Sequence, residues 1–217
     1  TKLLNASRFV LSQTRADVKA DVSAPLDRAL LARLAGVVDE ATVAFEAYDY
    51  TRALERTETF FWSFCDDYLE LVKNRAYGGG PGGASANRAL AMSLSSLLRL
   101  FAPFLVFVTE EVWSWWQEGS VHRQPWPEVG ALREAAGGVD PAVLDVTADV
   151  LGQVRRAKSE AKLSQRTPVA GVVIRDTPER LRALQEAEDD LRDAGSIAEL
   201  TYDEADQLAV EVTLVER

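Results

Sequence analysis

The stretch 89-ALAMSLSSLLRLFAPFLVFV-108 sets the architecture that we expect for this chain. Apolar side chains occupy most sides of a helix drawn through it, which is typical of a helix buried among other helices. Pro103 has no amide hydrogen and clashes with the preceding turn, so this helix should end or kink near Phe101. No apolar run in the sequence approaches the roughly 20 residues that span a bilayer. The stretch therefore predicts the centre of a helical bundle, and no membrane contact.

Three amphipathic segments precede this central helix. Apolar residues recur at steps of three and four, the helical period, through residues 2–13, 25–47 and 50–75. Ser23 is a candidate N-cap of the second segment, whose first turn holds Pro25. A short aromatic helix, TEEVWSWWQ (109–117), is expected after the central one.

The glycine-rich segment GGGPGGAS (78–85) breaks the helical pattern. It predicts a mobile loop tip, with the central helix beginning at Ser85. Gly78, Gly80 and Gly83 formally match the G-x-G-x-x-G spacing of dinucleotide-binding turns. That motif needs a preceding strand, and here a long helix precedes it, so we interpret the glycines as a loop.

Beyond the loop-like residues 118–139 the hydrophobic period changes. We expect two helices, at 140–163 and 177–192. Runs of β-branched or alternating residues predict three strands, at 167–175, 198–202 and 207–216. The sequence therefore predicts a mainly α chain, with a helical bundle over residues 1–137 followed by a small α+β subdomain over 138–217.

Charge is unevenly distributed along the chain. The net charge is −10, whereas a dedicated nucleic-acid binder is usually basic. Residues 1–20 nevertheless carry four cations against Asp17, namely Lys2, Arg8, Arg15 and Lys19. Residues 155–166 carry five against Glu160, namely Arg155, Arg156, Lys158, Lys162 and Arg166. Positive patches on an acidic body are compatible with a phosphate-backbone partner. The five are candidates for phosphate contacts, with a solvated helix face as the alternative.

No set of residues points to catalysis or to a metal. The single cysteine, Cys65, excludes a disulfide framework and a cysteine-rich metal site, and it fits a reducing cytoplasm. The only histidine, His122, lies in a loop-like stretch with nothing nearby to orient it. We expect no catalytic residue, metal or cofactor in this chain.

Phe9 is out of place in the opening helix. Wound at 100° per residue, the apolar residues of 2–13 fill one arc, and Lys2, Asn5, Arg8 and Ser12 fill the other, with Phe9 in its middle. An exposed aromatic ring stacks on unpaired RNA bases. In that hypothesis Asn5 reads a base edge, and Lys2 and Arg8 neutralise phosphates. The alternative is that another part of the fold covers Phe9.

Four segments together resemble the anticodon-binding region of class I aminoacyl-tRNA synthetases of the valine–isoleucine–leucine group. In chain order they are KLLNASRF (2–9), FCDDYLELVKNRAY (64–77), LFAPFLVFVTEEVWSWW (100–116) and SVHRQPWP (120–127). The first two are most similar to the valine-specific members, and isoleucine- or leucine-specific members are the alternatives. Phe101 and Val106 stand where the family usually has His and Pro, which we interpret as core variation.

The resemblance implies that the chain binds the anticodon stem-loop of a tRNA, and that Lys2, Asn5, Arg8 and Phe9 meet the anticodon. The parent enzyme would join valine to its tRNA with ATP. The nucleotide-binding motifs and the editing domain of the family are missing, so we expect an excised C-terminal portion that is inactive alone. ATP and Mg²⁺ would belong to the absent catalytic domain. The implied partners are tRNA and the rest of the synthetase chain, without DNA.

A function of another class is also open. The aromatic cluster at 113–116 and the overall acidity are compatible with a helical protein–protein interaction module that has no RNA role.

Overall fold

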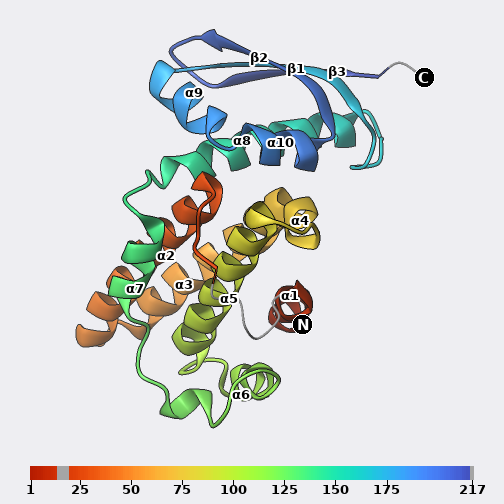
Figure 1. The fold of residues 1–217 in the computed structure, drawn as a ribbon. Helices are drawn as coiled ribbons and strands as arrows, with labels where there is room; N and C mark the ends of the chain where they lie inside the picture. The colour runs from red at the N-terminus through yellow and green to blue at the C-terminus, as the bar shows by residue number, and fades with distance from the viewer. Residues whose placement is uncertain (14–19, 216–217) are drawn as a thin grey trace.

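The computed structural model describes residues 1–13 and 20–215, in which a helical bundle is followed by a small α+β subdomain (Figure 1). Arg15, Asp17 and Lys19 lie outside the described residues. The bundle consists of α1 (Lys2–Gln13), α2 (Pro25–Glu46), α3 (Tyr50–Ser63), a π-helical turn η1 (Phe64–Tyr68), α4 (Leu69–Tyr77), α5 (Pro81–Phe101), α6 (Val106–Ser114), a 3₁₀ turn η2 (Val121–Arg123) and α7 (Val129–Ala136). The subdomain consists of α8 (Ala142–Glu160), β1 (Val169–Asp176), α9 (Pro178–Gln185), α10 (Glu188–Gly195), β2 (Ile197–Glu204) and β3 (Ala209–Leu214). The predicted fold class is confirmed.

Helix α5 is the centre of the bundle, as its sequence predicts. It packs against α1, α2, α3, α4 and α6, and Leu90, Leu97 and Leu98 are fully buried. The helix ends at Phe101, two residues before Pro103, because proline cannot continue the hydrogen-bond ladder.

The predicted third helix is one continuous helical run with a π-helical turn inside it. Phe64 and Tyr68 of η1 point into the core, where their rings stack 6.0 Å apart between centroids. The extra residue of a π turn shifts the faces of the helix on either side of it. Asp66, between these two core residues, therefore lies on the outside, beside α1.

The subdomain is a three-stranded sheet with strand order β2-β1-β3. The central strand β1 is parallel to β2 and antiparallel to β3, so that Ile174 faces Tyr202 on one side and Val210 on the other. Helices α8, α9 and α10 cover one face of the sheet (Figure 1). The last strand, β3, has only half-buried and exposed residues, so the other face meets water.

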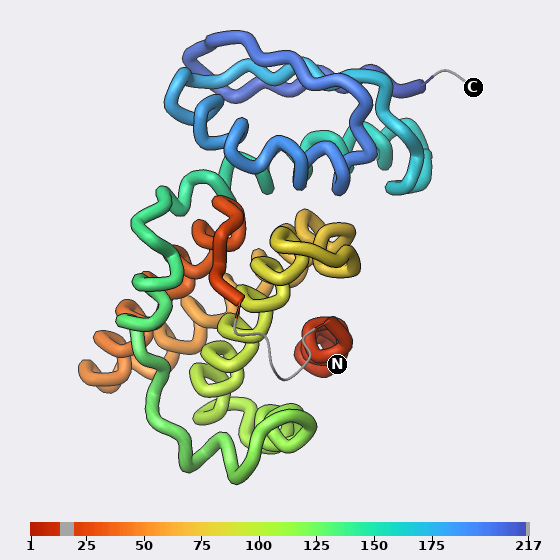
Figure 2. Tube along the Cα trace, in the orientation of Figure 1, coloured from red at the N-terminus to blue at the C-terminus, as the bar shows by residue number. Residues whose placement is uncertain are grey.

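The subdomain packs directly on the bundle. Helix α10 contacts α4, and α8 contacts α2 and η1. Figure 2 shows that the chain crosses from one part to the other once, between α7 and α8. The boundary at 137/138 stays a prediction.

A buried network around Arg75 joins the two parts. The Arg75 guanidinium donates two hydrogen bonds to Asp27 of α2, two to Asp190 of α10, and one to the carbonyl of Gly82, all between 2.8 and 3.0 Å. Burial works to lower the pKa of Arg75, but the hydrogen bonds to both carboxylates outweigh it and raise that pKa. Arg75 is therefore a permanent cation between α2, α4, α5 and α10.

The start of α2 differs from the prediction, and the buried Asp27 carboxylate is part of the reason. This carboxylate accepts hydrogen bonds from Tyr68 and Ser85, and the Ser85 hydroxyl in turn accepts the amides of Ser23 and Ala24. Ser23 is not the N-cap; Ala24 occupies that position without a side-chain cap. The amides before α2 are satisfied from α5 instead.

The prediction of a mobile glycine tip is wrong at its C-terminal half. Helix α5 begins at Pro81, four residues before the expected start at Ser85, and Gly80 precedes it with φ of 88°. Gly83 lies against the end of α4, where an added Cβ would sit 2.3 Å from the carbonyl oxygen of Gly78. Only glycine allows the two helices to approach this closely.

Substituting Gly83 by alanine should therefore destabilise the chain by about 1–3 kcal/mol, because the new methyl group meets backbone rather than a movable side chain. Urea denaturation measures the change. Gly79→Ala is the matched control, since nothing lies within 4 Å of its added Cβ. Equal stability of the two variants would contradict the close approach.

Replacing Arg75 by methionine should cost about 3–5 kcal/mol in the free energy of unfolding, since the fully buried Asp27 and the half-buried Asp190 both lose their counter-ion. Arg123→Met, at an exposed arginine of η2, should change it by less than about 0.5 kcal/mol. A loss below about 1 kcal/mol for Arg75→Met would show that the network is not a main tie between the two parts.

Candidate nucleic-acid interface

Most of the predicted strip on α1 faces a groove. Lys2, Asn5 and Phe9 form one wall of a cavity of about 340 Å³, and Cys65, Leu69, Glu70 and Lys73 of η1 and α4 contribute the other. The volume lies within the range of small-ligand sites and gives room for one nucleobase. Lys2 and Asn5 are exposed and Phe9 is half-buried, and all three line the groove from α1; their contact with RNA stays a prediction.

The sequence leaves open whether Phe9 is exposed for stacking or covered by the fold, and the structure shows a position between the two. Its ring is half-buried and meets Tyr77 edge-on, with the ring centroids 5.8 Å apart. The contact with Tyr77 fixes the orientation of the Phe9 ring, because an edge-to-face pair has a preferred geometry. The same ring lines the groove. Tyr77 therefore packs against the Phe9 ring, and part of the ring stays accessible in the groove.

Lys2 lies at the mouth of the groove and already has partners within the chain. Its ammonium donates a 2.6 Å hydrogen bond to Asp66 and lies 5.2 Å from the centre of the Trp62 ring. The hydrogen bond to Asp66 raises the pKa of Lys2. An exposed pair of this kind contributes little stability, so its consequence is positional: it holds the N-terminal turn of α1 against η1.

Arg8 does not belong to the groove. Its guanidinium lies over the ring of Trp115, the residue that follows α6, 5.7 Å from the ring centre. Arg8 is exposed, as predicted, but it does not line the groove with Lys2, Asn5 and Phe9. The 100° turn between neighbouring helical residues places Arg8 and Phe9 on different flanks, and only the packed neighbours show that the flanks are separated.

Two buried residues of the groove are missing from the sequence prediction. Cys65 and Leu69 are 7% and 8% exposed and form an apolar floor. Burial raises the pKa of the Cys65 thiol to about 12, so it stays a neutral thiol at physiological pH. The signal was present: Cys65, Leu69 and Lys73 recur every four residues, a helical face.

The basic segment 155–166 divides into three kinds of residue. Lys158 is 1% exposed. It is therefore not part of a solvated helix face. Arg156 pairs with Glu160 on the exposed side of α8. Arg155 pairs with Glu70 of α4 and donates to the carbonyl of Asp66. Lys162 and Arg166 follow α8 with exposed side chains.

The aromatic cluster at 113–116 is only partly packed, since Trp115 keeps 37% of its surface exposed. Trp113 is buried, Trp116 packs against the core, and the Trp115 indole donates to Glu111 beneath Arg8. The interpretation of Phe101 as core is confirmed. That of Val106 is wrong, since it begins α6 with 45% of its surface exposed.

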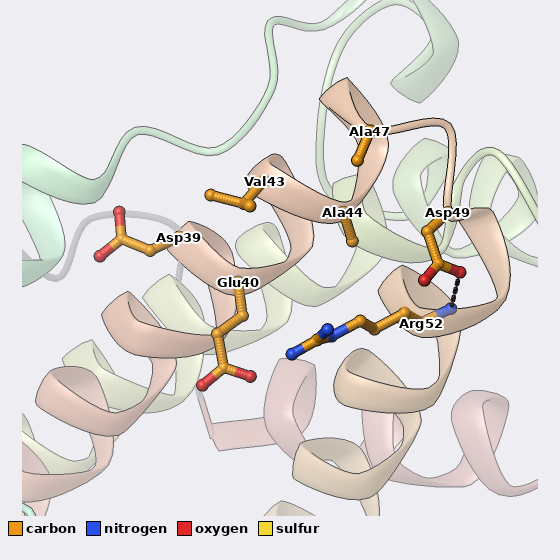
Figure 3. Close-up of a pocket in the computed structure, with 7 residues that line it drawn as sticks. All are labelled: Asp39, Glu40, Val43, Ala44, Ala47, Asp49 and Arg52. Atoms are coloured by element: carbon orange, nitrogen blue, oxygen red, sulfur yellow. Dashed lines mark hydrogen bonds between the residues drawn. The ribbon is translucent and has the colours of Figure 1, made fainter.

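A second apolar hollow, of about 290 Å³, lies between α2 and α3 (Figure 3). Val43, Ala44 and Ala47 form its apolar wall, and Arg52 extends across it toward Glu40. Asp39 and Asp49 add two more carboxylates against this single arginine. Their negative charge repels phosphate, so the hollow is no candidate for RNA.

Two further findings limit the chemistry. In residues 1–13 and 20–215, no group of three or more His, Cys, Asp or Glu side chains is arranged to hold a metal ion. Within the same ranges, no helix has the length and the apolar character needed to cross a membrane.

Comparisons with known proteins give one consistent result. Residues 27–174 match the family described as the anticodon-binding domain of tRNA ligase. The chain is 55% identical to the valine–tRNA ligase of Thermobifida fusca, covering 98% of this chain and 25% of that protein. The corresponding enzyme of Salinispora tropica is 52% identical, with 98% and 27% covered, and that of Cutibacterium acnes 44% identical, with 99% and 25% covered. The chain thus spans about a quarter of the length of these relatives.

The raised pKa of Cys65 predicts that its thiol reacts slowly with alkylating reagents. At pH 8, iodoacetamide should label the folded chain at least about 100-fold more slowly than the urea-unfolded chain, since almost no thiolate is present at a pKa of about 12. Mass spectrometry of timed samples measures the labelling. Equal rates in the two states would contradict a buried thiol on the floor of the groove.

Proposed function

Because the chain belongs to the anticodon-binding domain family of tRNA ligases, we propose that it holds the anticodon stem-loop of a tRNA for a valine–tRNA ligase. The parent enzyme would attach valine to its tRNA with ATP, and the regions that hold ATP and Mg²⁺ would lie outside this chain. The observation that carries the proposal is the groove between α1 and α4, with Phe9 on its wall and Leu69 on its floor. It supports a binding role and no catalysis within the chain.

The groove offers the contacts that an unpaired base needs. A base stacks on the Phe9 ring, as single-stranded RNA does on aromatic side chains. Leu69 supplies an apolar contact beneath it. The exposed Asn5 amide carries both donors and an acceptor, so it reads a base edge. The neutral Cys65 thiol adds apolar surface without a charge that would repel the RNA.

Lys73 and Lys2 take different parts in this proposal. Lys73 is exposed at the rim, where its ammonium forms a 3.8 Å ion pair with Glu70; in this proposal it turns from Glu70 toward a phosphate. Lys2 is hydrogen-bonded to Asp66. We therefore propose that its main role is to position α1, and that its contact with RNA is secondary. Arg8 lies on the other flank and has no role in the groove.

The overall charge of −10 shapes the interaction. Phosphate contacts dominate the affinity of most RNA-binding proteins, and an acidic chain with few clustered cations forms few of them. We therefore infer that the chain alone binds tRNA weakly, and that other regions of the synthetase add affinity. Such an enzyme works with translation in the cytoplasm, in keeping with a buried, unpaired cysteine.

Valine specificity rests on the relatives. The three proteins compared above are valine–tRNA ligases, at 44–55% identity over nearly the whole chain. These relatives favour valine over the isoleucine- and leucine-specific alternatives. The protein–protein alternative is less well supported than the RNA-binding one, because Trp113 is buried and Trp116 half-buried, which leaves Trp115 as the exposed aromatic residue of the cluster at 113–116.

Replacing Phe9 by alanine should lower the affinity for the anticodon stem-loop of valine tRNA by about 5- to 150-fold, the equivalent of about 1–3 kcal/mol of lost stacking. Fluorescence anisotropy with a labelled stem-loop measures the affinity. The loss should shrink for stem-loops with changed anticodon bases, because those bind less well to begin with.

The matched control is Phe107→Ala. Phe107 is 90% exposed at the start of α6 and does not line the groove, so this variant should bind as the unmodified chain does. Phe9→Ala should cost about 1–3 kcal/mol of stability, because the half-buried ring loses its Tyr77 contact and the apolar surface that it buries. Unchanged binding by Phe9→Ala, or a much larger loss of stability, would mean that Phe9 serves packing alone.

A further inference from the structure

A third hollow lies beside α4, between that helix and the α+β subdomain. It has a volume of about 410 Å³ and is walled by Lys73 of α4, Arg155 and Lys158 of α8, Arg166 of the segment before β1, and the end of α10. Both parts of the fold therefore build it, and it exists only because α10 is packed on α4 (Figure 1).

A buried, uncompensated cation lies in its wall. Lys158 is 1% exposed, and its ammonium donates to the carbonyls of Gln165 and Gly195, at 3.0 and 2.7 Å. An ammonium has three donors, and no carboxylate lies within ion-pair distance of this one in the described part of the chain. Burial lowers the pKa of Lys158, and Arg155 lowers it further. A buried positive charge of this kind is stabilised by an anion.

The remaining charges of the hollow also favour an anion. Arg155 is paired with Glu70. Asp193 is the only other acidic residue that lines the hollow, and four cations stand against these two carboxylates. Within residues 1–13 and 20–215, no hydrogen bond or ion pair is made by the Arg166 side chain, which is exposed. The hollow is thus a positive site on a chain whose net charge is −10.

The two cavities are neighbours. Glu70 and Lys73 line both the groove beside α1 and this hollow, so the two are separated only by the outer ridge of α4. A strand with one base in the groove and its backbone over Lys73 would reach the hollow with an adjacent phosphate.

We infer that the hollow between α4 and the α+β subdomain binds a backbone phosphate of the RNA whose base enters the groove, with Arg166 and Lys73 as its direct contacts and Lys158 as the buried charge behind them. The inference rests on the proposed function. It makes the subdomain part of the RNA interface. Of the five cations in 155–166, it selects Arg166 and Lys158, assigns Arg155 to the pairing with Glu70, and leaves Arg156 and Lys162 outside the site.

The test is the salt dependence of stem-loop binding by Arg166→Gln. Losing one phosphate contact should lower the slope of log affinity against log salt by about 0.7, the value for single-stranded nucleic acid. The affinity should fall by the same factor for every anticodon sequence, because a phosphate contact carries no sequence information. Arg156→Gln is the matched control on the exposed side of α8 and should leave the slope unchanged.

The outcomes separate the inference from the proposed function. A slope for Arg166→Gln equal to that of the unmodified chain, with binding that still depends on Phe9, would overturn the phosphate site alone. A chain that binds no stem-loop would overturn both. Equal urea midpoints of Arg166→Gln and the unmodified chain show that the fold is intact, as expected for an exposed side chain. Inorganic phosphate at constant ionic strength should compete with the stem-loop on the unmodified chain and less on Arg166→Gln; competition equal in both would contradict the site.

Discussion

One guanidinium, that of Arg75, holds the bundle and the subdomain in a fixed relation. All five of its N–H donors are used: two on Asp27, two on Asp190 and one on the carbonyl of Gly82. The planar fork of arginine suits this arrangement, whereas a lysine ammonium has three donors and no fork. Breaking a buried pair is costly, by about 3–5 kcal/mol, because the partner charges remain buried. The geometry of α4 relative to α2, α5 and α10 therefore depends on this residue.

The fixed position of α4 gives the surface its shape. Its inner face carries Arg75, and its outer ridge carries Glu70 and Lys73. With α1 on one side and α10 on the other, the ridge separates a groove with an apolar floor from a positive hollow. The first suits a base and the second a phosphate. In this acidic chain, the cations that line the hollow gather where the bundle and the subdomain meet. Their local positive charge offsets the repulsion of a phosphate by the net negative charge of the chain.

Helix periodicity and strand alternation predicted the elements well, because burial of one face imposes a pattern on the sequence. The end of α5 near Phe101 and the three strands are examples. Two predictions were wrong: α7 lies within residues 118–139, which were expected to be loop-like, and the single helix expected at 177–192 is two helices, α9 and α10. Local signals failed where a distant residue satisfied the backbone. Ser23 looked like a cap, but Ser85 accepts its amide from across the bundle. The glycines at 78–83 looked mobile, but Gly83 is needed for the approach of two helices. Neither partner is recognisable from nearby sequence.

The sequence by itself determined the fold class, the anticodon-binding resemblance and the common side of α1 on which Lys2, Asn5 and Phe9 lie, since each follows from residue type and spacing along the chain. Tertiary structure alone decided which residues share a site. It turned Arg8 toward Trp115, buried Lys158, and placed Cys65 and Leu69 beneath Phe9. The physical reason is that a helical period fixes the direction of a side chain, whereas a groove needs a second wall, and that wall is positioned by long-range packing and by the buried charges around Arg75.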